Sequence, residues 1–331
     1  MTRALQSLRA TPRLAGFFNH IPLVLFALLL LLFLCLSAPY FLSWQNITII
    51  LRQSAPLAIL CFGLVCVITG GGDDVVSGGI DLSLPAIAVL AVAIISDGLT
   101  NAGFSYPWLI ALVAGAVLLA GSVNAALVVA IRLPPLLATL ACSVAVIGLT
   151  NLLTQQRRIS VSDPVIVAFR DSSLLGLPLA VWFMLLVFLL FQFLVHHSRW
   201  GQHLQAAGGN REAAQLSGIS HTPLVIGSYL LGALAAALAS LTLVAQGSGS
   251  SPGTAEPLLL EMVLATFLGA AFSRRRVVTI WGALLGTLLV NALSNGLALL
   301  RVDIFWVGAI KGVLILVVLA AASLRRQRSH T

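Results

Sequence analysis

Side chains that could carry out chemistry are few in this sequence, and their spacing matches no known type of active site. The sequence has no GxxxxGK[ST] loop to cradle a phosphate, and no HExxH motif, GxSxG motif or Cys–His arrangement for catalysis. His196 and His197 are neighbours, and side chains one residue apart on a helix do not converge on one metal ion. We therefore expect no catalytic residue, no metal and no cofactor in this chain, and no enzymatic activity.

Isolated polar side chains within apolar runs are the next candidates, because ionisable groups inside a membrane usually serve a function. Asp81 either caps a helix, at a start that Ser83 and Pro85 also favour, or faces a polar, water-filled path through the protein. Asn124 is best explained by a structural hydrogen bond to a neighbouring helix. Glu261 either caps a helix at the outer interface or belongs to a functional site.

Lys311 needs a partner as well. Asp303 lies eight residues earlier, about two helical turns away, which is too far for a direct contact between the two side chains. We expect Lys311 to be satisfied by another helix or to extend its charge to the membrane surface.

The longest polar stretch with helix-forming residues is 201–220, which predicts a short helix of about two turns. Asn210 can cap the N-terminus of this helix, and Glu212 then lies in the first turn, where the helix dipole favours an anion. Gly208 and Gly209 are expected to loosen the entry to the helix.

The expected helix also has a marked end. Gly218 suits the left-handed position after the helix, and Ile219 could pack back on Ala214, as in a Schellman ending. A short helix with a small-residue face between two membrane spans suits a knob that fits a socket on a soluble partner. An ordinary interhelical loop is the alternative.

The composition sets the broad class of the protein. Of 331 residues, 59% are hydrophobic and 8% are charged, whereas soluble domains are about one quarter charged. The net charge of +8 comes almost entirely from arginine, which in a membrane protein indicates orientation and contact with lipid head groups. The sequence has no basic face with base-reading groups, so we expect no nucleic-acid partner.

Ten apolar runs approach the length of about 20 residues that a transmembrane helix requires. They are 21–41, 47–70, 82–97, 105–131, 134–154, 174–195, 223–245, 256–272, 277–299 and 303–322. The sequence therefore predicts an all-α, polytopic membrane protein with about ten transmembrane helices in a single domain, 1–331.

Arginine placement gives the orientation. With the N-terminus in the cytoplasm, twelve arginines lie on the cytoplasmic side and five on the outer side, as the positive-inside rule requires. The tails 1–20 and 323–331 and the loop 197–222 are then cytoplasmic.

Small residues gather in two of the expected spans. Gly232 and the alanines after it lie in the run 223–245, and Gly282 and Gly286 lie in the run 277–299. Small residues let helix backbones approach closely in lipid, so both sets are interpreted as packing faces.

Four blocks follow one another along the chain. They are GGIDLSLP at 78–85, PPLLATL at 134–140, GGNREAAQLSGI at 208–219, and the stretch 261–297, which ends in NGL. Together they resemble the bacterial ABC importer permeases of the ribose and other sugar transporters, and the third block resembles the cytoplasmic EAA-type loop of that family.

The resemblance implies an ABC importer permease fold with a cytoplasmic coupling helix, in the bacterial inner membrane. It implies the permease subunit of an ATP-driven importer for a sugar or sugar-like solute. The partners would be ABC ATPase subunits that bind the ATP, a periplasmic solute-binding protein, membrane lipid, and a second permease subunit, identical or different. The alternative is a stand-alone secondary transporter or channel for a small polar solute.

Site residues carry over from these blocks. The residues implied in coupling to the ATPase are Gly209, Asn210, Glu212, Ala213, Ala214 and Gly218. The candidates for the translocation pathway are Asp81, Ser83, Asn124, Glu261 and Asn295.

This chain departs from the family in two regions. Pro85 stands where glycine is usual, and the preceding GGGDDVVS, at 70–77, is longer than the common version. The triple arginine 274–276 replaces a glycine-rich turn and predicts a cytoplasmic end of a span, where it contacts anionic lipid or, as the alternative, the ATPase partner.

Two outer segments complete the expectations. The loop 155–173 is a candidate docking surface for the solute-binding protein, or an ordinary solvated loop. The segment 246–256, QGSGSSPGTAE, is expected to be a flexible outer loop.

Overall fold

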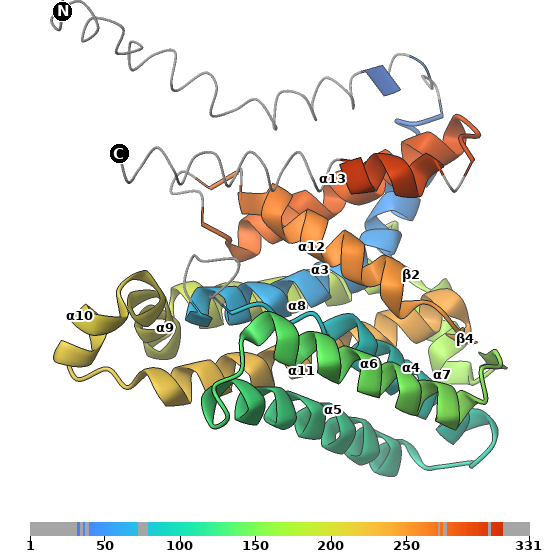
Figure 1. Ribbon diagram of the computed structural model, residues 1–331. Coiled ribbons are helices and arrows are strands. Elements are labelled where there is room, and N and C mark those ends of the chain that lie inside the picture. Colours follow the sequence, from blue (N-terminus) through green and yellow to red (C-terminus); the bar gives the residue numbers. More distant parts are fainter. Residues whose placement is uncertain are drawn as a thin grey trace, which may run out of the picture.

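The computed structural model describes residues 32–33, 36, 40–71, 79–270, 272–273, 277–303 and 306–313. Within this part of the chain the fold is helical with four very short strands (Figure 1). The helices are α3 (Trp44–Gly71), α4 (Leu84–Thr100), α5 (Tyr106–Val129), α6 (Pro135–Thr154), α7 (Pro164–Asp171), α8 (Leu179–His196), α9 (Arg199–Gly209), α10 (Arg211–Leu216), α11 (His221–Gly247), α12 (Ala255–Ala270) and α13 (Ile280–Leu299). The strands are β1 (Ile159–Ser160), β2 (Ser173–Leu174), β3 (Leu177–Pro178) and β4 (Gly249–Ser250).

Six of the described helices are long and apolar enough to cross a membrane: α3, α5, α6, α8, α11 and α13. Two more of the expected runs form shorter helices, α4 with 17 residues and α12 with 16. The expected runs 21–41 and 303–322 fall largely outside the described residues, as do most of the departure at 70–77 and all of the departure at 274–276. The fold is therefore that of a multi-pass membrane protein, with eight of the ten expected runs found as helices.

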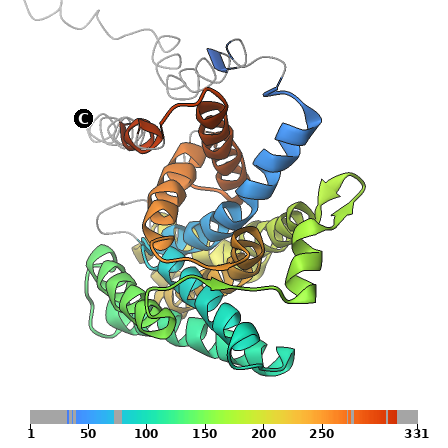
Figure 2. The same ribbon diagram turned by 90° about the vertical axis from the view of Figure 1, so that its right-hand side faces the viewer.

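Helix α3 lies at the centre of the molecule. It packs against α11, α13, α8 and α12, and in Figure 2 it runs between the α12–α13 pair and the group of α4, α5 and α11. Gly63 of α3 faces Gly232 and Ala235 of α11, and a Cβ added at Gly63 would lie 2.7 Å from the Ala235 Cβ. The small residues of α11 are thus a packing face, as predicted.

The α12–α13 contact confirms the second predicted packing face. A Cβ added at Gly286 would lie 2.0 Å from the carbonyl oxygen of Ala265, and one at Gly282 would lie 2.4 Å from that of Gly269. The two backbones therefore touch along this seam, which only glycine permits.

The short strands lie at one end of the helix bundle, and α9 and α10 lie at the other end (Figure 1). β1 pairs with β4 in antiparallel register, with Ile159 opposite Ser250, and β2 pairs with β3. The expectation of a flexible loop at 246–256 is therefore wrong in its first half. Residues 246 and 247 end α11, and β4 is held by a strand partner that the sequence pattern did not reveal.

Candidate functional site

The cytoplasmic loop expected at 197–222 contains two helices in place of the single one predicted. Ser198 caps α9, because its Oγ accepts a hydrogen bond of 3.0 Å from the amide of Gly201. Gly209 is the last residue of α9, so the expectation that the glycines loosen the entry to the next helix is wrong. Two features of the sequence could have predicted α9. Ser198 can cap a helix, and the apolar Leu204 and Ala207 are one turn apart on the face that is buried.

Helix α10 has the ends that the sequence predicts. The Asn210 Oδ1 accepts a hydrogen bond of 2.9 Å from the amide of Ala213. At the other end Gly218 has φ of +80°, its amide donates to Gln215, and the amide of Ile219 donates to the carbonyl of Ala214. These two bonds are those of a Schellman motif, so the local geometry of the helix is confirmed.

A small apolar cluster anchors this loop to the bundle. Leu204 and Ala207 of α9, Ala214 of α10 and Leu224 of α11 are buried together, and Ile219 packs against them. Ala214 is the only buried side chain of α10, and Leu216 is 92% exposed. α10 is thus a rigidly capped helix held on one side, and it projects from the end of the bundle (Figure 1).

The structure brings three of the pathway candidates together in a fully buried polar cluster. The Asp81 Oδ1 accepts hydrogen bonds from the backbone amide of Ser83 (2.9 Å) and from its hydroxyl (2.6 Å). The Asn124 Nδ2 donates to the Ser83 Oγ (2.7 Å) from the neighbouring helix α5. Asp81 therefore supports the start of α4, and Asn124 makes the interhelical bond that the sequence favours, whereas Ser83 occupies the N-cap position without a capping bond.

Thr139 of α6 joins the same region from another sequence block. Its Oγ1 accepts a hydrogen bond of 3.1 Å from the amide of Leu82 and donates to the carbonyl of Ile80. The blocks 78–85 and 134–140 therefore contact each other. Sequence reasoning missed this role for Thr139, since a lone threonine in an apolar helix gives no signal of its partner.

Glu261 and Asn295 lie apart from this cluster. Glu261 is in the middle of α12 and pairs with Lys311 of the helical segment 306–313, so the first of the two alternatives, a helix cap, is wrong. Of the two alternatives for Lys311, the structure shows the partner on another helix. Asn295 of α13 accepts a hydrogen bond of 2.9 Å from the side chain of Asn46 in α3.

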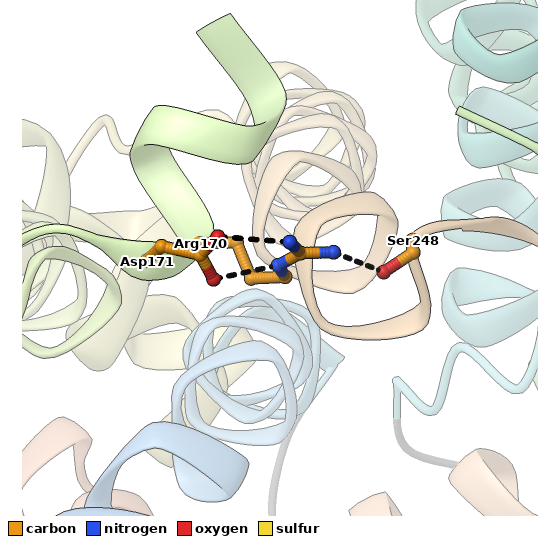
Figure 3. A network of polar contacts seen from close by, with 3 residues as sticks. All are labelled: Arg170, Asp171 and Ser248. Carbon is orange, nitrogen blue, oxygen red and sulfur yellow. Dashed lines mark hydrogen bonds and ion pairs between the residues drawn. The ribbon is translucent and has the colours of Figure 1, made fainter. Parts of the chain in front are cut away.

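The opposite end of the molecule carries an ordered polar surface. Arg170, in the last turn of α7, makes a two-pronged ion pair with Asp171 (both contacts 2.8 Å) and donates to the Ser248 Oγ at 2.7 Å (Figure 3). The bond from Arg170 holds the pKa of Asp171 below its usual value. These contacts fasten the segment 155–178 to the end of α11.

A cavity of about 30 Å³ lies beside this surface, between α6 and the segment 250–256. Its polar lining includes Thr150, Thr154 and Ser250. That volume holds one or two water molecules and is too small for a sugar ring. Across the described residues, no group of three or more His, Cys, Asp or Glu side chains is placed to hold a metal ion.

Comparison with known proteins shows the family to which this chain belongs. The family model described as "Branched-chain amino acid transport system / permease component" matches residues 46–319. The chain is 32% identical over 306 residues to a ribose import permease of Bacillus subtilis, covering 91% of each protein. It is 30% identical over 315 residues to a galactofuranose transporter permease of Escherichia coli, covering 92% of this chain and 89% of the relative.

A third relative is a fructose import permease of Rhizobium meliloti, 28% identical over 308 residues, which cover 91% of this chain and 84% of the relative. No solved structure matches the chain. Since the family model spans most of the sequence, and the relatives align over nearly their whole length, this chain belongs to the permease-component family of branched-chain amino acid transport systems.

Proposed function

We propose that this chain is the membrane-spanning permease subunit of an ATP-driven ABC importer for a sugar or sugar-like solute. The relatives named above import ribose, galactofuranose or fructose, which supports a polyhydroxylated solute. The chain would cross a bacterial inner membrane about ten times as a single domain, with both termini in the cytoplasm. A second permease subunit, identical or different, would complete the pathway.

The observation that carries the proposal is the shape of α10. Both of its ends are fixed by its own caps, one side is anchored through Ala214, and the remaining side chains are exposed. A short, rigid, protruding helix can transmit a push without bending. We assign it to a socket on cytoplasmic ATPase subunits, which bind the ATP, with Gly209, Asn210, Glu212, Ala213, Ala214 and Gly218 shaping the contact.

The outer surface formed by 155–178 and 247–256 is the proposed dock for a periplasmic solute-binding protein. Its backbone is fixed by strand pairing between β1 and β4 and by the bonds of Arg170, so a partner would meet a preformed surface. It lies at the end of the bundle opposite to α10, as an importer with partners on both sides of the membrane requires (Figure 1).

The test is a pull-down of the tagged protein from mild detergent. The Leu216→Asp variant places a charge on the exposed tip of α10, where no buried contact is lost. We expect an ATPase to co-purify with the unaltered protein and to be lost with this variant. Leu175→Asp is the matched control, because Leu175 is 83% exposed in the β2–β3 turn at the opposite end of the molecule.

Retention of the ATPase by Leu216→Asp would contradict the assignment of α10 as its dock. A protein that purifies without an ATPase and carries ion-driven flux in liposomes would contradict the importer and favour a secondary transporter.

A further inference from the structure

Four buried side-chain polar atoms have no hydrogen-bond partner among the described residues, and two of them lie on the packed helices α5 and α11. These two are the Asn124 Oδ1 of α5 and the Tyr229 hydroxyl of α11. Both side chains are fully buried. Such atoms are uncommon in native proteins, because a buried polar group without a partner costs the free energy of its lost hydration.

Both groups lie where α5 crosses α11. Gly121, one turn before Asn124, packs so closely that an added Cβ would lie 3.2 Å from the carbonyl oxygen of Tyr229. Tyr229 is also buried in one hydrophobic cluster with Ala125, the residue next to Asn124. The backbones of the two helices therefore meet close to Asn124 and Tyr229, and the amide oxygen and the phenol have no bond between them in this state.

The two groups are chemically complementary. A tyrosine hydroxyl can donate a hydrogen bond, and an amide oxygen can accept one. The orientation of the amide is set by the cluster, because the Asn124 Nδ2 donates to the Ser83 Oγ, which itself donates to Asp81. The Asn124 Oδ1 is thereby left as the acceptor.

Helix α11 links this crossing to the cytoplasmic loop. It begins at His221, shortly after α10, and Tyr229 lies about two turns further along. Leu224 of α11 belongs to the cluster that anchors α9 and α10, and Gly227 lies against the indole of Trp200 in α9. A displacement of the loop therefore acts on α11 close to Tyr229.

We propose that Tyr229 and Asn124 are positioning residues of a two-state hydrogen-bond switch. A shift of α11, driven through α9 and α10, brings the Tyr229 O–H onto the Asn124 Oδ1 in the alternate conformation of the transport cycle. The bond is absent in the present state, so it lowers the free energy of the alternate state alone and shifts the equilibrium toward it. This inference rests on the proposed function of the chain as an ATP-driven permease.

The test uses the complete complex of permease, ATPase and binding protein in proteoliposomes, with Tyr229→Phe as the variant. This substitution removes the unpaired hydroxyl and keeps the ring. We expect the thermal midpoint of the resting complex to rise or stay unchanged, because an unsatisfied group is lost. The rate of ATP-driven uptake should fall about fivefold, because the loss of one neutral hydrogen bond from one state lowers the population of that state by about this factor.

Two further variants make the test specific. Tyr40→Phe is the matched control, since Tyr40 is exposed, and it should leave both readings unchanged. In the Asn124→Ala background, Tyr229→Phe should cause no additional loss of uptake, because the acceptor is already absent.

Unchanged uptake in Tyr229→Phe, or independent effects of the two substitutions, would overturn the switch while leaving the importer intact. A fall in thermal midpoint in proportion to the loss of uptake would also overturn it, because the hydroxyl would then have a structural partner at rest. Absence of ATP-driven uptake by the unaltered complex is a separate outcome, which refutes the proposed function and the switch together.

Discussion

At the scale of single residues, α10 is determined by local chemistry. Asn210 and Gly218 could be assigned from sequence because a cap and a left-handed helix end involve neighbours within a few positions. The partners of Glu261 and Thr139 could not, because Lys311 and Leu82 lie far away in sequence and only the packing of separate helices brings them together.

The charge of Glu212 gives a prediction at this scale. Glu212 is exposed in the first turn of α10, so Glu212→Lys should leave membrane insertion intact and weaken the helix by about 0.3–1 kcal/mol through the dipole. If α10 docks on an ATPase, uptake should fall by about tenfold or more, a loss of at least about 1.4 kcal/mol of interaction. Solute uptake and ATP hydrolysis are measured together in proteoliposomes.

Gln202→Lys is the control for this substitution. Gln202 is exposed on α9, and its replacement introduces the same positively charged side chain outside α10. Full ATP-driven uptake by Glu212→Lys would argue against the role of Glu212 in coupling.

At the scale of elements, the sequence predicted where the apolar helices lie but not which helices and strands contact each other. Apolar run length located eight helices, because hydrocarbon demands continuous apolar sequence. The same criterion missed α9, which is half polar and lies in a loop, and it gave no sign that β4 pairs with β1. The small residues of α11 and α13 predicted close packing correctly, although the sequence did not say which helix each would meet.

The α12–α13 seam can be tested with one methyl group. Gly286→Ala places a Cβ 2.0 Å from the Ala265 carbonyl oxygen, so the helices must separate, at a cost of about 1–3 kcal/mol. Gly115→Ala on α5 is the control, because its Cβ would meet nothing within 4 Å. Thermal unfolding in detergent should show a lowered midpoint for Gly286→Ala alone, and equal midpoints would refute the close contact.

The ion pair between α12 and the segment 306–313 gives a second prediction for the elements. The side chains of Lys311 and Glu261 are 15% and 23% exposed, so removing one charge leaves the other poorly solvated. Glu261→Gln should destabilise the protein by about 1–3 kcal/mol, between the values for surface and buried pairs. The double reversal Glu261→Lys with Lys311→Glu should recover most of the thermal midpoint, whereas an unchanged midpoint in Glu261→Gln would show that the pair contributes little.

At the scale of the whole molecule, the two ends of the bundle have different architectures. One end presents α10 as an exposed, capped helix, and the other presents a surface fixed by β1, β4 and Arg170 (Figures 1 and 3). Between them, α3 is buried against α11 and α13, and Asp81, Ser83 and Asn124 form a polar cluster beside α11. This arrangement gives a continuous series of packed helices from α9 and α10 to the centre of the bundle.

The most direct test of the account is ATP-driven uptake by the reconstituted complex, with the ATPase recovered in the pull-down and its associated binding protein. The account predicts accumulation of a radiolabelled sugar in proteoliposomes only when ATP is present on the ATPase side. We also expect Leu216→Asp to abolish accumulation because the ATPase no longer binds. Leu175→Asp should leave the binding of the ATPase unchanged. Sugar flux through the chain alone, unaffected by ATP and by Leu216→Asp, would contradict the central claim.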